Sequence, residues 1–169
     1  LAQRMIKIPQ QAEANVVVIE SFMIETFGQA RHARSVWQLR SGPPLLGMCL
    51  VIRDGDEPVG SLRYWEVRLG DEVILLLGPL AVRPGLWGRG YGRQLIEESL
   101  RRVAAGPWRL ILVSGEEDYY PKFGFVPAAP YGIDWPGFIE PERLQFFELE
   151  KGALASLPSG PLPVSALSP

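Results

Sequence analysis

A loop rich in glycine and arginine joins an apolar stretch to an amphipathic one, and this junction constrains the fold most. Residues 73–82 read as a buried strand, and the loop of residues 83–93 has glycine at every second position from 88 to 92. A helix is expected to open near Arg89, where unobstructed backbone N–H groups converge. The helix dipole and the side chains of Arg89 and Arg93 favour an anion there. The junction predicts a pyrophosphate-binding loop.

The segment after the loop has the pattern of an amphipathic helix. Glu97 and Glu98 each precede an arginine by four residues, the order that stabilises a helix. The sequence Gly106-Pro107 is expected to end the helix, with the glycine as a left-handed cap. A strand at residues 108–113 follows, so the region predicts a parallel strand–helix–strand crossover. The apolar face of the helix consists of Leu95, Ile96, Ser99, Leu100 and Val103.

Two motifs identify a resemblance to a known family. Residues 87–92, Trp-Gly-Arg-Gly-Tyr-Gly, resemble the Gln/Arg-x-x-Gly-x-Gly/Ala signature of the GCN5-related N-acetyltransferases (GNAT), with tryptophan in the first place. They match neither the dinucleotide fingerprint nor a Walker loop. Residues 120–125, Tyr-Pro-Lys-Phe-Gly-Phe, resemble the family's Tyr-x-x-x-Gly-Phe. Together with Tyr119 they are similar to the branch of predicted acetyltransferases that carries a Tyr-Tyr-x-x-Phe-Gly-Phe segment. The resemblance covers about residues 5 to 150.

The resemblance implies an enzyme that moves an acetyl group from acetyl-CoA to an amine by direct attack in a ternary complex. It implies a mixed α/β fold: a twisted, mostly antiparallel sheet with a splayed central strand pair and helices on both faces. Gly78-Pro79 interrupts the strand where the splay would admit the pantetheine arm. Tyr120 would protonate the departing thiolate. The implied cofactor-binding residues are Leu80, Ala81, Val82, Trp87, Gly88, Arg89, Gly90, Tyr91, Gly92, Arg93, Tyr119 and Phe123.

No general base is assigned. Many relatives carry a carboxylate on the fourth strand, where this chain has Leu76. Glu66, Asp71 and Glu72 lie near in sequence but are expected to be solvated, and a water molecule or a neutral amine would serve equally well. The missing carboxylate leaves open a second function class, a non-catalytic acyl-CoA-binding or sensing module. The acceptor, a small-molecule or peptide amine, and the use of a longer acyl chain are left open.

The length and composition of the chain limit its domain count, its partners and its cellular location. The 169 residues suit one acetyltransferase domain over residues 1–151 and a Pro/Ser-rich tail over residues 152–169. A net charge of −2 argues against nucleic acid as partner, and no apolar run is long enough to span a membrane. The single cysteine, Cys49, and the absence of a signal peptide favour the cytoplasm. No metal-ligand spacing occurs, so no metal is expected. A monomer or a homodimer fits equally well.

Other elements are expected from local patterns. A short strand at residues 5–8 precedes two helices, at 11–27 and 29–40. Three antiparallel strands then fill residues 45–82. A loop with a short helix (114–123), a strand from 125, an irregular stretch (127–141) and a last strand (144–149) follow, before an extended or partly ordered tail from residue 157. Tyr64, Trp65, Trp135 and Phe138 are candidates to line the acceptor pocket, although ordinary burial is the favoured interpretation for each.

Overall fold

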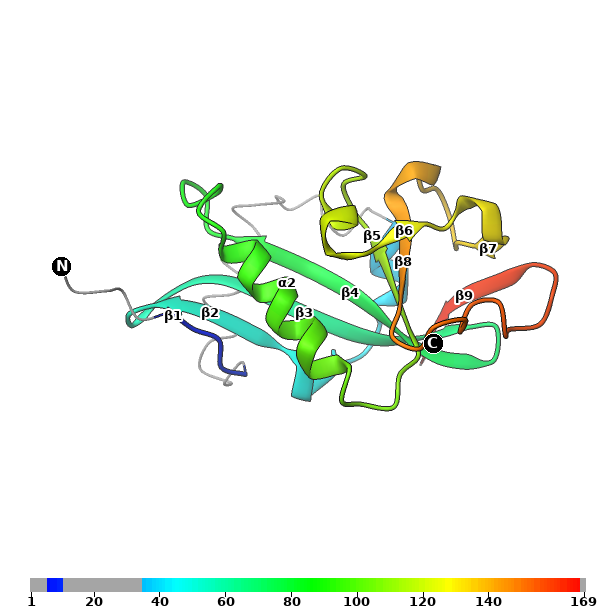
Figure 1. Cartoon of the computed structure of the whole chain (residues 1–169), viewed down its shortest axis with the longest axis horizontal. Helices are drawn as coiled ribbons and strands as arrows, with labels where there is room; N and C mark the ends of the chain where they lie inside the picture. Colours follow the sequence, from blue (N-terminus) through cyan, green and yellow to red (C-terminus); the bar gives the residue numbers. More distant parts are fainter. Residues whose placement is uncertain (1–5, 11–34, 168–169) are drawn as a thin grey trace.

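The computed structural model describes residues 6–10 and 35–167, and in this part of the chain nine strands form a mostly antiparallel sheet (Figure 1). The main path runs β1-β2-β3-β4-β5-β8-β6, and β9 joins β3 to β7. Only the β4–β5 and β7–β9 pairs are parallel. The strands are β1 (Ile6–Lys7), β2 (Leu50–Asp54), β3 (Glu57–Leu69), β4 (Glu72–Val82), β5 (Leu110–Ser114), β6 (Val126–Pro127), β7 (Ile133–Asp134), β8 (Leu144–Glu148) and β9 (Leu162–Ala166).

The sheet separates two hydrophobic cores because side chains alternate along each strand. On β4, Leu75 and Leu77 face helix α2 (Tyr91–Val103), while Ile74 and Leu76 face the other core. Helix α2 lies across β2, β3 and β4 on its side of the sheet (Figure 1). The opposite core is covered by short 3-10 turns and by loop segments, among them η3 (Ser35–Leu39). The described residues thus place one α-helix on one face. The helix expected at residues 11–27 lies outside the described residues, and so does the first part of the helix expected at residues 29–40. The rest of that second helix was predicted wrongly, because Ser35–Leu39 form the 3-10 helix η3.

Strands β4 and β5 separate part-way along their length. Their parallel pairing begins at Leu75 opposite Ile111 and ends at Leu77 opposite Val113. The pairing of β4 with β3 continues to Val82, with an irregularity near Leu62. The peptide bond between Gly78 and Pro79 is cis, and Pro79 has no N–H to offer a neighbouring strand. The two strands therefore diverge beyond this point, as Figure 1 shows, and the splayed central pair expected from the sequence is present.

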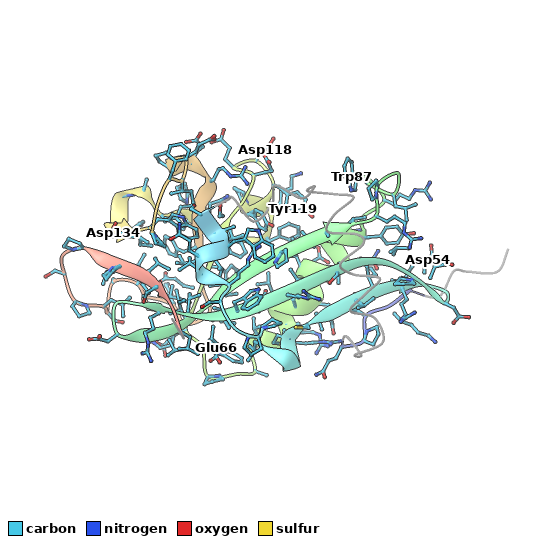
Figure 2. All side chains as sticks on the ribbon, turned by 180° about the vertical axis from the view of Figure 1, so that it is seen from behind. Asp54, Glu66, Trp87, Asp118, Tyr119 and Asp134 are labelled. Atoms are coloured by element: carbon cyan, nitrogen blue, oxygen red, sulfur yellow. The ribbon has the colours of Figure 1, made fainter. Side chains whose placement is uncertain are left out.

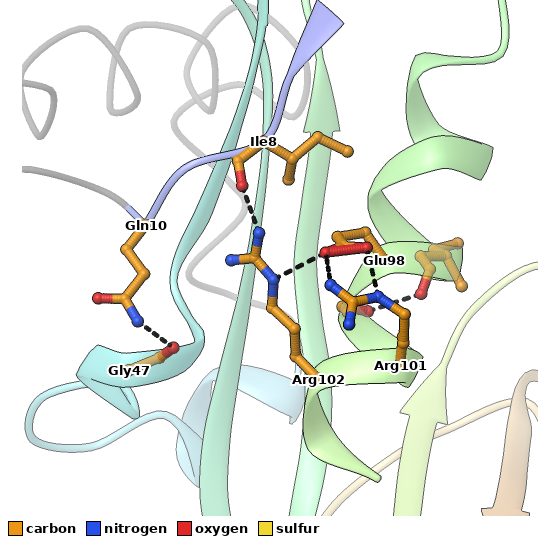
Figure 3. Close-up of polar contacts among 8 residues, drawn as sticks. Ile8, Gln10, Gly47, Glu98, Arg101 and Arg102 are labelled. Atoms are coloured by element: carbon orange, nitrogen blue, oxygen red, sulfur yellow. Dashed lines mark hydrogen bonds and ion pairs between the residues drawn. The ribbon is translucent and has the colours of Figure 1, made fainter. Parts of the chain in front are cut away.

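Helix α2 begins close to the predicted residue and has the predicted apolar face, but it ends differently from the prediction. It stops at Val103 with Ala104 as a right-handed cap, and Gly106 does not adopt the left-handed conformation. Its outer face is fixed by Glu98, which binds both Arg101 and Arg102 (Figure 3). Arg102 also donates a 2.6 Å hydrogen bond to the carbonyl of Ile8, so the N-terminal strand is tied to the helix.

Several local expectations are wrong. Residues 46–48 form the 3-10 turn η4 (Leu46–Met48) rather than the start of a strand. The stretch expected to be irregular contains η6 (Ala129–Tyr131), strand β7 and η7 (Pro141–Arg143).

The expected tail is built into the fold. Ala153 and Leu154 are buried, and β9 pairs with β3 through Val164–Ala166 and with β7 through Leu162 and Pro163. Alternate residues of β9, Leu162 and Val164, pack into the core opposite α2, so the proline-rich composition hid a half-buried edge strand. No helix within the described ranges is long and apolar enough to cross a membrane.

Candidate active site

The start of helix α2 leaves its first backbone N–H groups without a side-chain cap. Gly90 precedes the helix in a left-handed conformation with φ 84°, which other residues rarely adopt. No side chain caps the first turn, although the N–H groups at a helix start require acceptors. Gly88 has φ 82° as well, so the loop turns sharply just before the helix. An anion at this position would satisfy the exposed donors.

The arginine and aromatic residues of the loop differ in how they face this helix start. Arg93 projects into solvent and forms a 3.6 Å ion pair with Glu97. Trp87 is 63% exposed, and its indole nitrogen donates a 2.9 Å hydrogen bond to the carbonyl of Val82 at the end of β4. Tyr91 instead turns inward, and its hydroxyl donates a 2.7 Å hydrogen bond to Asp54. Tyr91 thereby connects the helix start to the end of β2, and its side chain is buried.

Tyr119, in the loop after β5, reaches the first turn of α2 and packs against the same core as this helix. Its hydroxyl lies 2.9 Å from the point that a Cβ on Gly92 would occupy. A side chain at position 92 would therefore force the Tyr119 hydroxyl to shift, whereas the φ angle of Gly92 sets no such limit. Burial raises the pKa of Tyr119, so its phenol stays protonated and able to donate a hydrogen bond. Phe123 supports the ring edge-on, with 5.3 Å between the ring centroids.

A cavity of about 750 Å³ opens where β4 and β5 diverge. It is bounded by the interrupted part of β4, the loop after β5, the turn η5 (Tyr120–Phe123), the turn η3 and the loop before η7. The residues that line it and matter below are Trp37, Arg40, Gly78, Leu80, Gly115, Glu116, Tyr119, Tyr120, Phe138 and Arg143. The cavity thus joins Leu80 to both tyrosines of the sequence motif.

Tyr120 is buried and lines this cavity. Its ring lies against the backbone of Gly115, where an added Cβ would stand 2.1 Å from a ring carbon. Burial raises the pKa of Tyr120 well above its ordinary value; the neighbouring Tyr119 adds to this, and the positive charges of Arg40 and Arg143 oppose it. The phenol is therefore protonated at neutral pH and has the form that a proton donor needs.

The four charged residues of the cavity, Arg40, Glu116, Glu140 and Arg143, were not identified from the sequence. Arg40 lies on the η3 side, Glu116 follows β5, and Arg143 ends η7. Arg143 and Glu116 form a 3.3 Å ion pair. Nothing in the sequence marked them, because they stand far apart along the chain and belong to neither motif. Only the fold of the split sheet brings them together.

The carboxylates of Glu66, Asp71 and Glu72, considered above as candidates for the general base, do not line the cavity. Glu66 accepts a 3.0 Å hydrogen bond from the indole of Trp108, and Figure 2 shows it well apart from Tyr119. Glu72 is bound to Arg109, and Asp71 lies in the turn between β3 and β4. Leu76 is buried in the core opposite α2. The carboxylates that do line the cavity are those of Glu116 and Glu140.

Of the aromatic candidates for an acceptor pocket, only Phe138 lines the cavity. Tyr64 is buried under α2 with its hydroxyl hydrogen-bonded to Ser99, and Trp65 is buried in the opposite core. Trp135 is also buried and donates a hydrogen bond to Ser35. Among the residues that the structure describes, no group of three His, Cys, Asp or Glu side chains could hold a metal ion.

Comparison with known proteins agrees with this geometry. The family model described as an acetyltransferase (GNAT) domain matches residues 46–127, which span the sheet from η4 to β6 and include both sequence motifs. This match, together with the relatives described next, supports assignment to the GNAT superfamily of acyltransferases. The split β4–β5 pair lies inside the matched region.

The similarity of this chain to individual relatives is distant but extends over most of the fold. The uncharacterized N-acetyltransferase YhbS of Escherichia coli K12 is 27% identical over 123 residues, 70% of this chain and 74% of YhbS. YjhQ of the same strain is 30% identical over 110 residues, 61% of this chain and 60% of YjhQ. The crystal structure of E. coli YhbS in complex with CoA superposes with a TM-score of 0.78 at 25% identity, covering 96% and 91% of the two chains. A Brucella melitensis GNAT acetyltransferase in complex with acetyl-CoA shares the fold, with a TM-score of 0.70, 20% identity and 98% of both chains covered.

Replacing Gly115 by alanine tests how the Tyr120 ring is packed. The new methyl group would overlap the tyrosine ring, so the ring or the β5 end must move. We expect Gly115→Ala to lower the free energy of unfolding by about 1–3 kcal/mol, the usual range for overpacking. Gly47→Ala is the matched control, since nothing lies within 4 Å of that position. Denaturant unfolding of both variants measures the difference, and equal stabilities would contradict the packing described for Tyr120.

Proposed function

We propose that this protein binds acetyl-CoA in the split between β4 and β5 and transfers the acetyl group directly to an amine in a ternary complex. The observation that carries the proposal is the cavity that runs from Leu80 to Tyr120 beside the uncapped start of α2. The helix start suits a pyrophosphate because it offers backbone N–H groups without a side-chain cap. The cavity suits the thioester because it leads to a proton donor. The CoA complex of YhbS, a relative with the same fold, supports the choice of ligand.

The helix start would hold the pyrophosphate through backbone N–H groups of residues 90–93. Arg89 and Arg93 would add positive charge at the surface, and the Tyr119 hydroxyl would reach the same turn beside Gly92. Trp87 would lie beside the bound cofactor at the loop before α2. Phe123 would lie beside it at Tyr119 and Tyr120. Pantetheine would take the place of the missing strand partner along β4, where Leu80, Ala81 and Val82 no longer pair with β5.

In the chemical step, the amine nitrogen bonds to the thioester carbonyl carbon and the carbon–sulfur bond breaks. The sulfur leaves as a thiolate that takes a proton from Tyr120. The proton lost by the amine goes to solvent, and the Tyr120 phenolate takes a proton back from solvent. The raised pKa keeps the phenol protonated but makes it a weak acid, so its contribution should be modest. The reaction needs no side-chain base on β4 if the amine arrives neutral.

The pyrophosphate site is tested by replacing Gly90 with valine. A β-branched side chain at the start of α2 would stand between the phosphate and the backbone N–H groups. We expect acetyl-CoA affinity, measured by calorimetry, to fall roughly tenfold or more, about 1.4 kcal/mol. Gly55→Val is the matched control, because Gly55 also has a positive φ but lies in the β2–β3 turn. Equal affinity of two folded variants would refute the assignment.

The acid is tested by Tyr120→Phe, which keeps the ring and removes the hydroxyl. We expect acetyl-CoA affinity to change little and turnover to fall roughly tenfold to a few hundredfold, the lower part of the range for general acids. Because a free thiolate is a tolerable leaving group above its own pKa, the loss should grow as pH falls from about 9 to 6. Thiol release with a panel of small amines, amino acids, polyamines and peptides provides the assay. Unchanged rates over that pH range would make Tyr120 a packing residue.

The same assay separates the enzyme from a sensing module. The observation that favours the module is Leu76, which stands where many relatives carry a carboxylate. A module would bind acetyl-CoA and release no thiol with any amine, whereas the proposed enzyme releases thiol in proportion to acetylated product.

A further inference from the structure

The backbone carbonyl of Glu116, in the loop after β5, accepts hydrogen bonds from three donors. The side-chain amide of Gln145, on β8, donates one of 3.2 Å. The backbone N–H groups of Tyr119 and Tyr120 donate the other two, of 3.3 and 3.5 Å. The Gln145 amide also donates to the carbonyl of Gly115, at 3.5 Å. One side chain therefore holds the loop at the point where the two tyrosines follow.

Gln145 is an unusual residue for its place in the sheet. Only 1% of its surface is exposed, although glutamine is mostly found on protein surfaces. The residue opposite it on β5 is Val113, a core residue. The amide oxygen of Gln145 is buried as well and has no hydrogen-bond partner within the described part of the chain. An apolar side chain of similar length would fill this space without leaving a buried oxygen unpaired. Packing alone thus does not account for an amide here, whereas its hydrogen bonds to the loop do.

The phenol of Tyr120 depends on this loop for its direction. Its hydroxyl forms no hydrogen bond with any residue that the structure describes. The ring is held by contacts instead, because it lies so close to Gly115 that no Cβ would fit there. Tyr119 and Phe125 meet the ring edge-on, at centroid distances of 5.3 and 5.6 Å. A shift of the backbone at Gly115 would therefore turn the phenol within the cavity.

We propose that Gln145 is a positioning residue for the proton donor. It fixes the backbone of Gly115 and Glu116 and thereby sets the direction of the Tyr120 phenol toward the leaving sulfur. Gln145 is not among the residues that line the cavity, and it exchanges no proton in the reaction. This inference rests on the proposed function and adds a residue that acts through Tyr120. Its removal should therefore lower kcat and change acetyl-CoA affinity little.

The test removes the amide donors and keeps the length of the side chain. Gln145→Met should lower kcat in the thiol-release assay roughly three- to thirtyfold, since misplacing a reacting group costs up to about 100-fold. The loss should stay below that of Tyr120→Phe, because Gln145 acts only through that phenol. Gln145→Leu removes the same donors and should give a similar loss. The assay uses the amine from the panel above that the unmodified protein acetylates fastest.

Two readouts separate positioning from a purely structural role. In the Tyr120→Phe background, Gln145→Met should change kcat by less than about twofold, because no phenol is left to position. In the unmodified background, its loss should grow as pH falls from about 9 to 6, as for Tyr120→Phe. The charged groups that act on Tyr120, those of Arg40, Glu116 and Arg143, are kept in every variant.

Gln10→Met is the matched control. The Gln10 amide also donates a hydrogen bond to a backbone carbonyl, 3.1 Å from that of Gly47 in η4 (Figure 3). Neither residue lines the cavity. The loss of this single exposed bond should leave kcat within about twofold at every pH.

Three results would decide against the inference. The first is an unchanged kcat in Gln145→Met and Gln145→Leu. The second is a loss that is equal with and without the Tyr120 phenol and independent of pH, which would make Gln145 a structural residue. The third is failure of both variants to fold, judged by calorimetric binding of acetyl-CoA, which would assign Gln145 to the stability of the loop. None of these touches the proposed function, which would be refuted by an unmodified protein that releases thiol with no amine.

Discussion

The parallel ladder between β4 and β5 is three residue pairs long, and the site depends on its ending there. Up to Leu77 the two strands hold each other as in any sheet. Beyond it, Gly78-Pro79 removes the donor and the regular pleat, while β3 continues to pair with β4 as far as Val82. Strand β4 is therefore held on one side and open on the other. That asymmetry creates the cavity and leaves backbone groups available to a ligand.

Everything else in the site is arranged around this opening. Helix α2 brings its uncapped N-terminus to one end of it, and the Tyr91–Asp54 hydrogen bond fixes that end to the sheet. From the loop after β5, Tyr119 reaches the same helix turn over Gly92, and Tyr120 lies on Gly115. Gly92 leaves room for the Tyr119 hydroxyl, and Gly115 leaves room for the Tyr120 ring. A side chain at either position would displace the neighbouring tyrosine.

The sequence predicts local order well because its strongest patterns are local. The strand, loop and helix around Gly90, the irregularity at Pro79 and the turn bearing both tyrosines follow from periodicity and turn chemistry, and the family resemblance connects them. Strand β9 was missed because proline-rich composition resembles an unstructured tail, whereas its alternate residues pack on the core. Arg40 and Glu116 were missed for another reason: their proximity to Tyr120 depends on long-range packing, which leaves no periodic signal. Conversely, Glu66 and Glu72 are near β4 in sequence but already bound by Trp108 and Arg109.

The central claim is that the β4–β5 split receives the acyl donor, with its sulfur at Tyr120 and its pyrophosphate on the start of α2. A crystal structure of the protein with CoA tests it most directly. The account predicts the pyrophosphate oxygens on the backbone N–H groups of residues 90–93 and the sulfur within hydrogen-bonding reach of the Tyr120 hydroxyl, about 3–3.5 Å. A CoA molecule bound outside the split, or one whose sulfur points away from Tyr120 while the cavity stays empty, would contradict it.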